Sequence, residues 1–92
     1  MSAAYRFSVS IMPRDGILDP AGRAVEAALP ELHADNVHAV RVGRRVELTV
    51  EADDSATAKR TVEKLAADFL ANPLVERWEI EELGAVVGVG AA

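Results

Sequence analysis

Arginine and glycine cluster in the middle of this 92-residue chain, at residues 41–45, and occur together again where Arg14 and Gly16 follow a predicted strand. A guanidinium group binds a carboxylate or a phosphate through forked hydrogen bonds. These arginines therefore fit an acidic partner or a phosphate group. The alternative is that Arg41 pairs with Glu47 and the other arginines are solvated, and the sequence leaves both interpretations open.

The other residue types that could do chemistry are not arranged for it. His33 and His38 lie five residues apart with no acidic residue at a recognised ligand spacing, so a metal site is not indicated. Asp53 and Asp54 are more simply a helix start than an acid and base pair. A nucleophile beside a base, or a close carboxylate pair, is not evident. We therefore expect no catalytic residue, no bound cofactor and no metal in this chain.

Composition narrows the class of protein. The chain has 15 acidic and 10 basic side chains, and its net charge of -5 would repel a phosphate backbone, so we expect no nucleic-acid partner. No apolar run approaches the roughly 20 residues that a membrane span needs, and no signal-peptide pattern opens the chain. The absence of cysteine suits a reducing compartment, and we expect a cytoplasmic protein.

Two elements stand in the first third of the chain. Apolar and polar residues alternate from Tyr5 to Met12, which predicts a half-buried strand. Asp19 and Pro20 then form a helix start. The carboxylate of Asp19 can accept hydrogen bonds from the free amides of the first turn, and Pro20 has no amide proton at a position where that proton would have no partner in the helix. The apolar stripe of this helix predicts that it lies on a sheet, and Pro30 predicts a kink or an end near Leu29. The stripe consists of Ala21, Ala24, Val25, Ala28, Leu29 and Leu32.

A hairpin is predicted next, from strands at residues 37–42 and 46–50. If Val42 faces Val46, then Val40 faces Leu48, and one side of the pair is apolar while the other side is charged. The predicted turn is therefore at residues 43–45.

The second half of the chain repeats the pattern of a helix followed by a strand. Asp53, Asp54 and Ser55 offer caps for a helix that ends at Asn72 and Pro73. A fourth strand is predicted over residues 74–82. The glycine-rich residues 84–92 are expected to form a flexible tail after a single domain of residues 1–83. The apolar stripe of the helix consists of Ala58, Val62, Leu65, Ala66, Phe69 and Leu70.

The order of elements is β-α-β-β-α-β, which predicts an α+β protein with the ferredoxin-like arrangement. In this two-layer sandwich, a four-stranded antiparallel sheet carries both helices on one face. Right-handed crossovers place the first and third strands in the centre of the sheet.

Three motifs carry a resemblance to a known family. They are the helix start Leu18, Asp19, Pro20 and Gly22, the hairpin Val40, Arg41, Gly43 and Arg44, and the segment Leu70, Ala71 and Asn72. Through them the domain resembles the small PurS-type subunits of phosphoribosylformylglycinamidine (FGAM) synthase, also called formylglycinamide ribonucleotide amidotransferase.

The resemblance implies a non-catalytic role in purine biosynthesis. In that family a glutaminase subunit releases ammonia from glutamine, and a large synthetase subunit uses ATP and Mg to convert formylglycinamide ribonucleotide (FGAR) to FGAM. The small subunit, a dimer or tetramer, joins the other two and assists ammonia transfer. By resemblance, Asp19, Pro20 and Gly22 shape the helix start, and Arg41, Gly43 and Arg44 shape a hairpin tip that meets a partner.

Two other classes of protein compete with this interpretation. A small ferredoxin-like regulatory domain would bind an amino acid or a nucleotide, and the isolated chain would then show saturable binding of that small ligand. An acylphosphatase-like enzyme would need a catalytic arginine and an asparagine, but Asn36 and Asn72 lie in predicted loops. We therefore rank the enzyme last.

Overall fold

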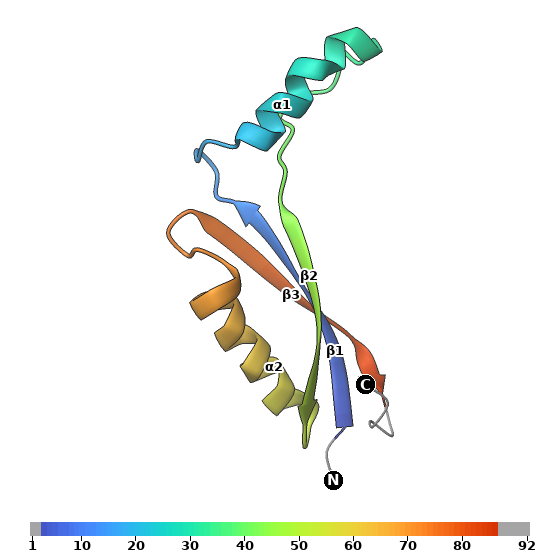
Figure 1. Cartoon of the computed structure of the whole chain (residues 1–92), viewed down its shortest axis with the longest axis vertical. Coiled ribbons are helices and arrows are strands. Elements are labelled where there is room, and N and C mark those ends of the chain that lie inside the picture. Colours follow the sequence, from blue (N-terminus) through green and yellow to red (C-terminus); the bar gives the residue numbers. More distant parts are fainter. Residues whose placement is uncertain (1–2, 87–92) are drawn as a thin grey trace.

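The computed structural model describes residues 3–86 and shows an α+β fold with a three-stranded antiparallel sheet. Strand β1 (Ala3–Pro13) lies between β2 (Arg44–Ala52) and β3 (Glu76–Val86), as Figure 1 shows. Helix α1 (Pro20–Ala28) continues into a 3-10 helix (Leu29–Leu32), and helix α2 (Ser55–Leu65) continues into a π-helical turn (Ala66–Leu70).

The core lies between the sheet and α2. The apolar side predicted for the first strand is confirmed, since Phe7, Val9 and Ile11 are fully buried on the face that α2 covers, whereas Ser8 on the predicted polar side is also buried. Asp54 begins α2 by accepting a hydrogen bond from the Thr57 amide at 2.7 Å. The residues of α2 and its π-helical turn that are fully buried in this core are Ala58, Val62 and Ala66.

The predicted hairpin is wrong. Residues 37–42 form no strand, and the positive φ of Ala39 (57°) interrupts an extended conformation there. β2 instead pairs with β1, where Val46 lies opposite Val9. Glu47 makes its ion pairs with Arg6 and Arg45 rather than with Arg41. The sheet of the described residues therefore has three strands and not the predicted four.

The placement of both helices on one face of the sheet is also wrong. α1, its 3-10 helix and the return segment to Val42 form an arm, residues 20–42, that projects beyond the end of the sheet (Figure 1). The molecule measures 55 × 28 × 18 Å, and its radius of gyration of 17.4 Å exceeds the roughly 12 Å expected for a compact chain of this length. The apolar stripe of α1 consequently lies exposed, with Val25 43% and Leu32 70% accessible.

Proline acts on the arm as predicted. Regular α-helix ends at Ala28, and the 3-10 helix that contains Pro30 begins at Leu29. At the other end of the chain, β3 includes residues 84–86, which the predicted tail contained. Residues 87–92 of that tail lie outside the described residues. No helix within residues 3–86 is long and apolar enough to cross a membrane.

Candidate functional site

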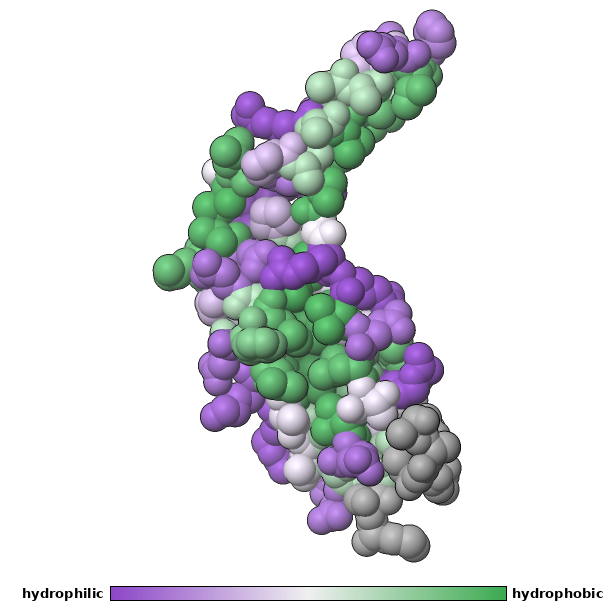
Figure 2. Space-filling model, viewed as in Figure 1, coloured by the Kyte–Doolittle hydropathy of each residue, from purple (hydrophilic) through white to green (hydrophobic). Residues whose placement is uncertain are grey.

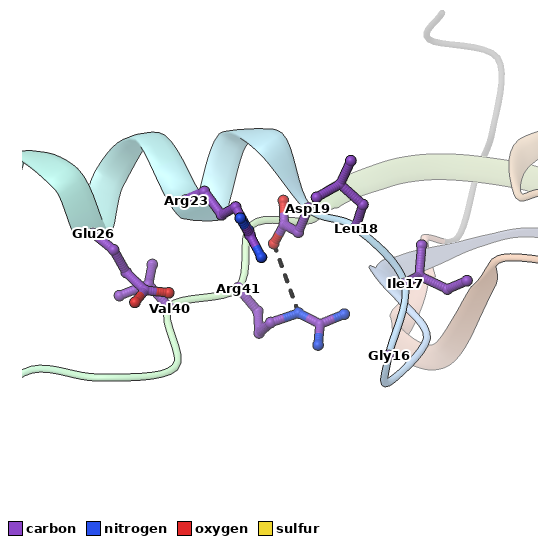
Figure 3. A pocket seen from close by; sticks show the side chains of 8 residues that line it. All are labelled: Gly16, Ile17, Leu18, Asp19, Arg23, Glu26, Val40 and Arg41. Carbon is purple, nitrogen blue, oxygen red and sulfur yellow. Dashed lines mark ion pairs between the residues drawn. The ribbon is translucent and has the colours of Figure 1, made fainter.

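A cavity of about 360 Å³ lies where the arm joins the sheet, and we call this place the junction. Figure 3 shows its lining from three segments: the loop after β1, the first turns of α1 and the end of the arm. Acidic and basic side chains face one another across it. The lining residues are Gly16, Ile17, Leu18, Asp19, Arg23, Glu26, Val40 and Arg41.

The carboxylate of Asp19 binds both ends of the arm. Its Oδ1 accepts the Gly22 amide at 3.0 Å, which caps α1, and its Oδ2 accepts the Val42 amide at 2.8 Å. Pro20 occupies the first helical position, as the sequence predicts. One side chain, only 10% exposed, thus closes a loop of more than twenty residues and holds the arm at its base.

Arg41 ties the same place to β1. Its Nη2 donates to the carbonyl oxygens of Pro13 and Arg14, each at 2.9 Å. Its Nε is buried without a hydrogen bond and lies 3.7 Å from Oδ2 of Asp19, as the dashed line in Figure 3 marks. Arg41 therefore fixes the return of the arm onto the sheet, and it does not stand at a hairpin tip.

Two glycines allow the backbones to approach closely at the junction. A Cβ on Gly22 would come within 2.5 Å of the Val40 carbonyl oxygen and of Oδ2 of Asp19. A Cβ on Gly43 would collide with the carbonyl oxygen of Ile11 and with the sulfur of Met12. No side chain fits at either position without moving backbone, so the two glycines set how the arm meets the sheet.

Arg44 lies next to the junction but binds on another side. Its guanidinium forms a forked ion pair with Glu76, with Nη1 to Oε2 at 2.6 Å and Nη2 to Oε1 at 3.1 Å. Nη2 also donates to the Leu70 carbonyl at 2.6 Å. Arg44 therefore anchors the start of β2 to the end of the π-helical turn and to the first residue of β3, and Glu76 is a partner that the sequence analysis did not find.

The hydrogen bonds also shift carboxyl pKa values. The Gly22 and Val42 amides, with Arg41 nearby, lower the pKa of Asp19 from its ordinary 3.8. The side-chain hydrogen bond from Arg44 lowers the pKa of Glu76 from its ordinary 4.5. A carboxyl group whose pKa is lowered in the folded state stabilises the fold at pH values above the pKa that the group has in the unfolded chain. This stabilisation is lost as the pH falls through the lower, folded value.

We accordingly expect the effect of Glu76→Gln to depend on pH. Glutamine loses the forked ion pair, so the variant should be less stable than the wild type at pH 7. Wild-type Glu76 becomes protonated in acid, so the difference should shrink between pH 5 and about pH 3. Urea unfolding of both proteins at these pH values checks this. A difference in unfolding free energy that stays constant from pH 7 to about pH 3 would contradict it.

The structure thus brings the six predicted site residues to one end of the sheet, five at the junction and Arg44 beside it. Of the described residues, no three His, Asp or Glu lie close enough to hold a metal ion. An arm with an exposed apolar face is typical of a protein that assembles with other chains.

The chain belongs to the PurS family. A family model described as PurS, phosphoribosylformylglycinamidine (FGAM) synthase, matches residues 6–83. A similar relative, subunit PurS of this synthase from Synechocystis, is 40% identical over 81 residues, which is 88% of this chain and 81% of the relative.

Solved structures agree with the sequence comparison. The purS subunit of the synthase from Thermotoga maritima is 31% identical, with a TM-score of 0.82 over 90% of this chain and 95% of that one. A chain in the structure of PurLQS from Thermotoga maritima is 32% identical, with a TM-score of 0.79 over 87% of this chain and 98% of that one. The residues that match the family model include the whole arm and its junction.

Proposed function

We propose that this chain is the non-catalytic subunit of FGAM synthase that joins the glutaminase and synthetase subunits and assists ammonia transfer between them. Membership of the PurS family over residues 6–83 carries the proposal. The likeness to a chain of PurLQS supports a place in a complex with other subunits. A regulatory domain that binds an amino acid or a nucleotide is not favoured.

The glutaminase and synthetase subunits carry out the chemical steps in this proposal. In this proposal ATP and Mg act in the synthetase, and this chain binds neither. The complex works in the cytoplasm, and the absence of cysteine from the chain suits that reducing compartment.

Self-association is part of the proposal, because one copy leaves its sheet incomplete. Within residues 3–86, β2 pairs with β1 on one side only. Of the described helices, only α2 with its π-helical turn covers the inner face, and Val46, Leu48 and Val50 of β2 stay partly exposed there. Leu65 and Phe69, at the end of α2 and in its π-helical turn, are 37% and 79% exposed, and Figure 2 shows apolar surface on this part of the molecule. A second helix and a fourth strand would cover these groups.

The arm carries both missing elements, and it extends away from its own sheet. A two-fold axis at Arg44 would place residues 40–42 of one copy along the free edge of β2 in the other. Val42 then faces the other copy's Val46, and Val40 faces its Leu48, in the register that the apolar pattern favours. The exposed stripe of α1 would cover the inner face of the second copy. Each copy would thereby complete a four-stranded, ferredoxin-like layer for the other.

A disulfide tests this pairing, since the chain has no cysteine of its own. In the double variant Val42→Cys/Val46→Cys, the two thiols of one copy are separated by about 13 Å of near-extended chain, too far to bridge. Mild oxidation should therefore yield a covalent dimer on a non-reducing gel.

The matched control is Val42→Cys/Glu47→Cys, which shifts the register by one residue and places the thiols on opposite faces of the sheet. It should remain mostly monomeric on the gel. Equal cross-linking of both variants, or none in either, would contradict the proposed register.

The role in the synthase is tested by reconstitution with the two catalytic subunits from the same organism. Glutamine-dependent FGAM synthesis should require the chain, whereas synthesis fed with free ammonia should not. A chain that does not co-elute with either subunit in gel filtration would argue against the role.

A further inference from the structure

An arginine lies on the axis of the proposed contact between two copies. In the register of that contact, Val42 faces the second copy's Val46, so the residue midway between them, Arg44, faces the second copy's Arg44. Like charges directly opposite each other on neighbouring strands are destabilising. The contact therefore needs a counter-charge at its axis.

The amide of Val42 indicates how close the two arginines come. This amide already donates to Oδ2 of Asp19, 2.8 Å away in the same chain. Val42 therefore belongs to a pair that exchanges no backbone hydrogen bonds with the second copy. Pairs with and without these bonds alternate along an antiparallel ladder, so Arg44, two residues further on, belongs to a pair of the same kind. The Cα atoms of such a pair lie only about 4.5 Å apart, with the side chains close together.

Arg44 is held in this position within its own copy. Its two bonds to Glu76 and its bond to the Leu70 carbonyl are all 3.1 Å or shorter. Glu76 is fixed in turn, because its Oε1 also accepts the Asn72 amide at 2.7 Å. Half of the Arg44 side chain (50%) nevertheless stays accessible, whereas only 18% of the Glu76 side chain does. The guanidinium group is thus open to a second copy and has its counter-charge beside it.

Glu76 is the group that balances Arg44 on this face of the sheet. Arg44 shares the face of Val46, which packs against the core, because side chains alternate along a strand. The neighbouring Arg45 points to the other face and pairs there with Glu47 at 3.0 Å. The ion pair of Arg44 and Glu76 therefore brings no net charge from either copy to the axis.

We propose that Glu76 is the counter-charge of the contact between two copies, and that two pairs of Arg44 and Glu76 form a charge-balanced cluster of four side chains on its axis. The inference rests on the self-association in the proposed function and adds the group that allows its register. The occupant is a second copy of this chain, because a two-fold axis brings the same surface of each copy together.

Removal of charge at two positions tests the cluster. Glu76→Gln leaves two uncompensated guanidinium groups at the axis, and Arg44→Gln/Glu76→Gln removes both charges of each copy. Glu79→Gln is the matched control, since it removes an equal charge from an exposed position of β3, the edge strand away from β2. Sedimentation equilibrium at low and high salt measures the dissociation constant of the dimer, and circular dichroism checks that each variant is folded.

At low salt, Glu76→Gln should raise the dissociation constant at least about tenfold, because two like charges then face each other at close range. Salt screens this repulsion, so most of the loss should be recovered near about 1 M salt, where the Debye length is about 3 Å. The double variant should dimerise nearly as well as the wild type at low salt, and so should Glu79→Gln.

A purely structural role of Glu76 predicts a different result. The double variant also lacks the ion pair, so it would then dimerise as weakly as Glu76→Gln at every salt concentration. That result, or an unchanged dissociation constant in Glu76→Gln, would overturn the cluster and leave the register to the disulfide test. A wild type that stays monomeric at all concentrations would contradict the proposed self-association itself.

Discussion

Replacing Gly43 with alanine is expected to lower the free energy of unfolding by about 3 kcal/mol, the upper range for overpacking a tight site. The added methyl group would strike the carbonyl oxygen of Ile11 and the sulfur of Met12. The methionine side chain can move away, but the Ile11 carbonyl belongs to the central strand, whose residues pair on both sides. Relief therefore has to come from shifting backbone at the junction.

Urea unfolding of Gly43→Ala measures this, with Ile17→Ala as the control in the lining of the junction. Ile17 is 36% exposed and lies outside the proposed contact between copies, so its truncation should cost no more than about 1 kcal/mol. Equal losses in the two variants would show that the close approach at Gly43 is not needed for the fold.

The second large effect is expected from Asp19→Asn, and it should appear in the arm. The two carboxylate oxygens of Asp19 accept the amides of Gly22 and Val42, one each. Asparagine is as good a helix cap as aspartate, but it has one acceptor oxygen and can satisfy only one of the two amides. The variant should therefore free one end of the arm, and hydrogen exchange at Gly22 or Val42 should become several-fold faster.

Asp54→Asn provides the matched control, because Asp54 caps α2 through a single amide, that of Thr57. One acceptor suffices there, so exchange at the start of α2 should change little. If the two variants altered exchange to the same extent, the account of Asp19 as a double acceptor would be wrong.

Much of the local structure could be predicted because it depends on neighbours in sequence. The buried alternation of β1, the caps at Asp19 and Asp54 and the change of helix type at Leu29 are each set by a few adjacent residues. The contacts of Arg44 could not be predicted, because Glu76 lies 32 residues away and no local pattern connects them.

The predicted hairpin shows a different limit of prediction from sequence. Its register follows from apolar and charged positions, but the same pattern fits one chain folding back or two copies pairing. Likewise, the stripe of α1 predicts that the helix needs an apolar partner, without naming the chain that supplies it. The arm was missed for this reason, although all six site residues lie around its base.

The adaptor role is tested most directly by the ratio of glutamine-fed to ammonia-fed FGAM synthesis, measured with the two catalytic subunits in the presence and absence of this chain. The account predicts that omitting the chain abolishes glutamine-fed synthesis and leaves the ammonia-fed rate nearly unchanged, because the chain joins subunits and performs no bond making. An unchanged ratio without the chain, or equal loss of both rates, would contradict it.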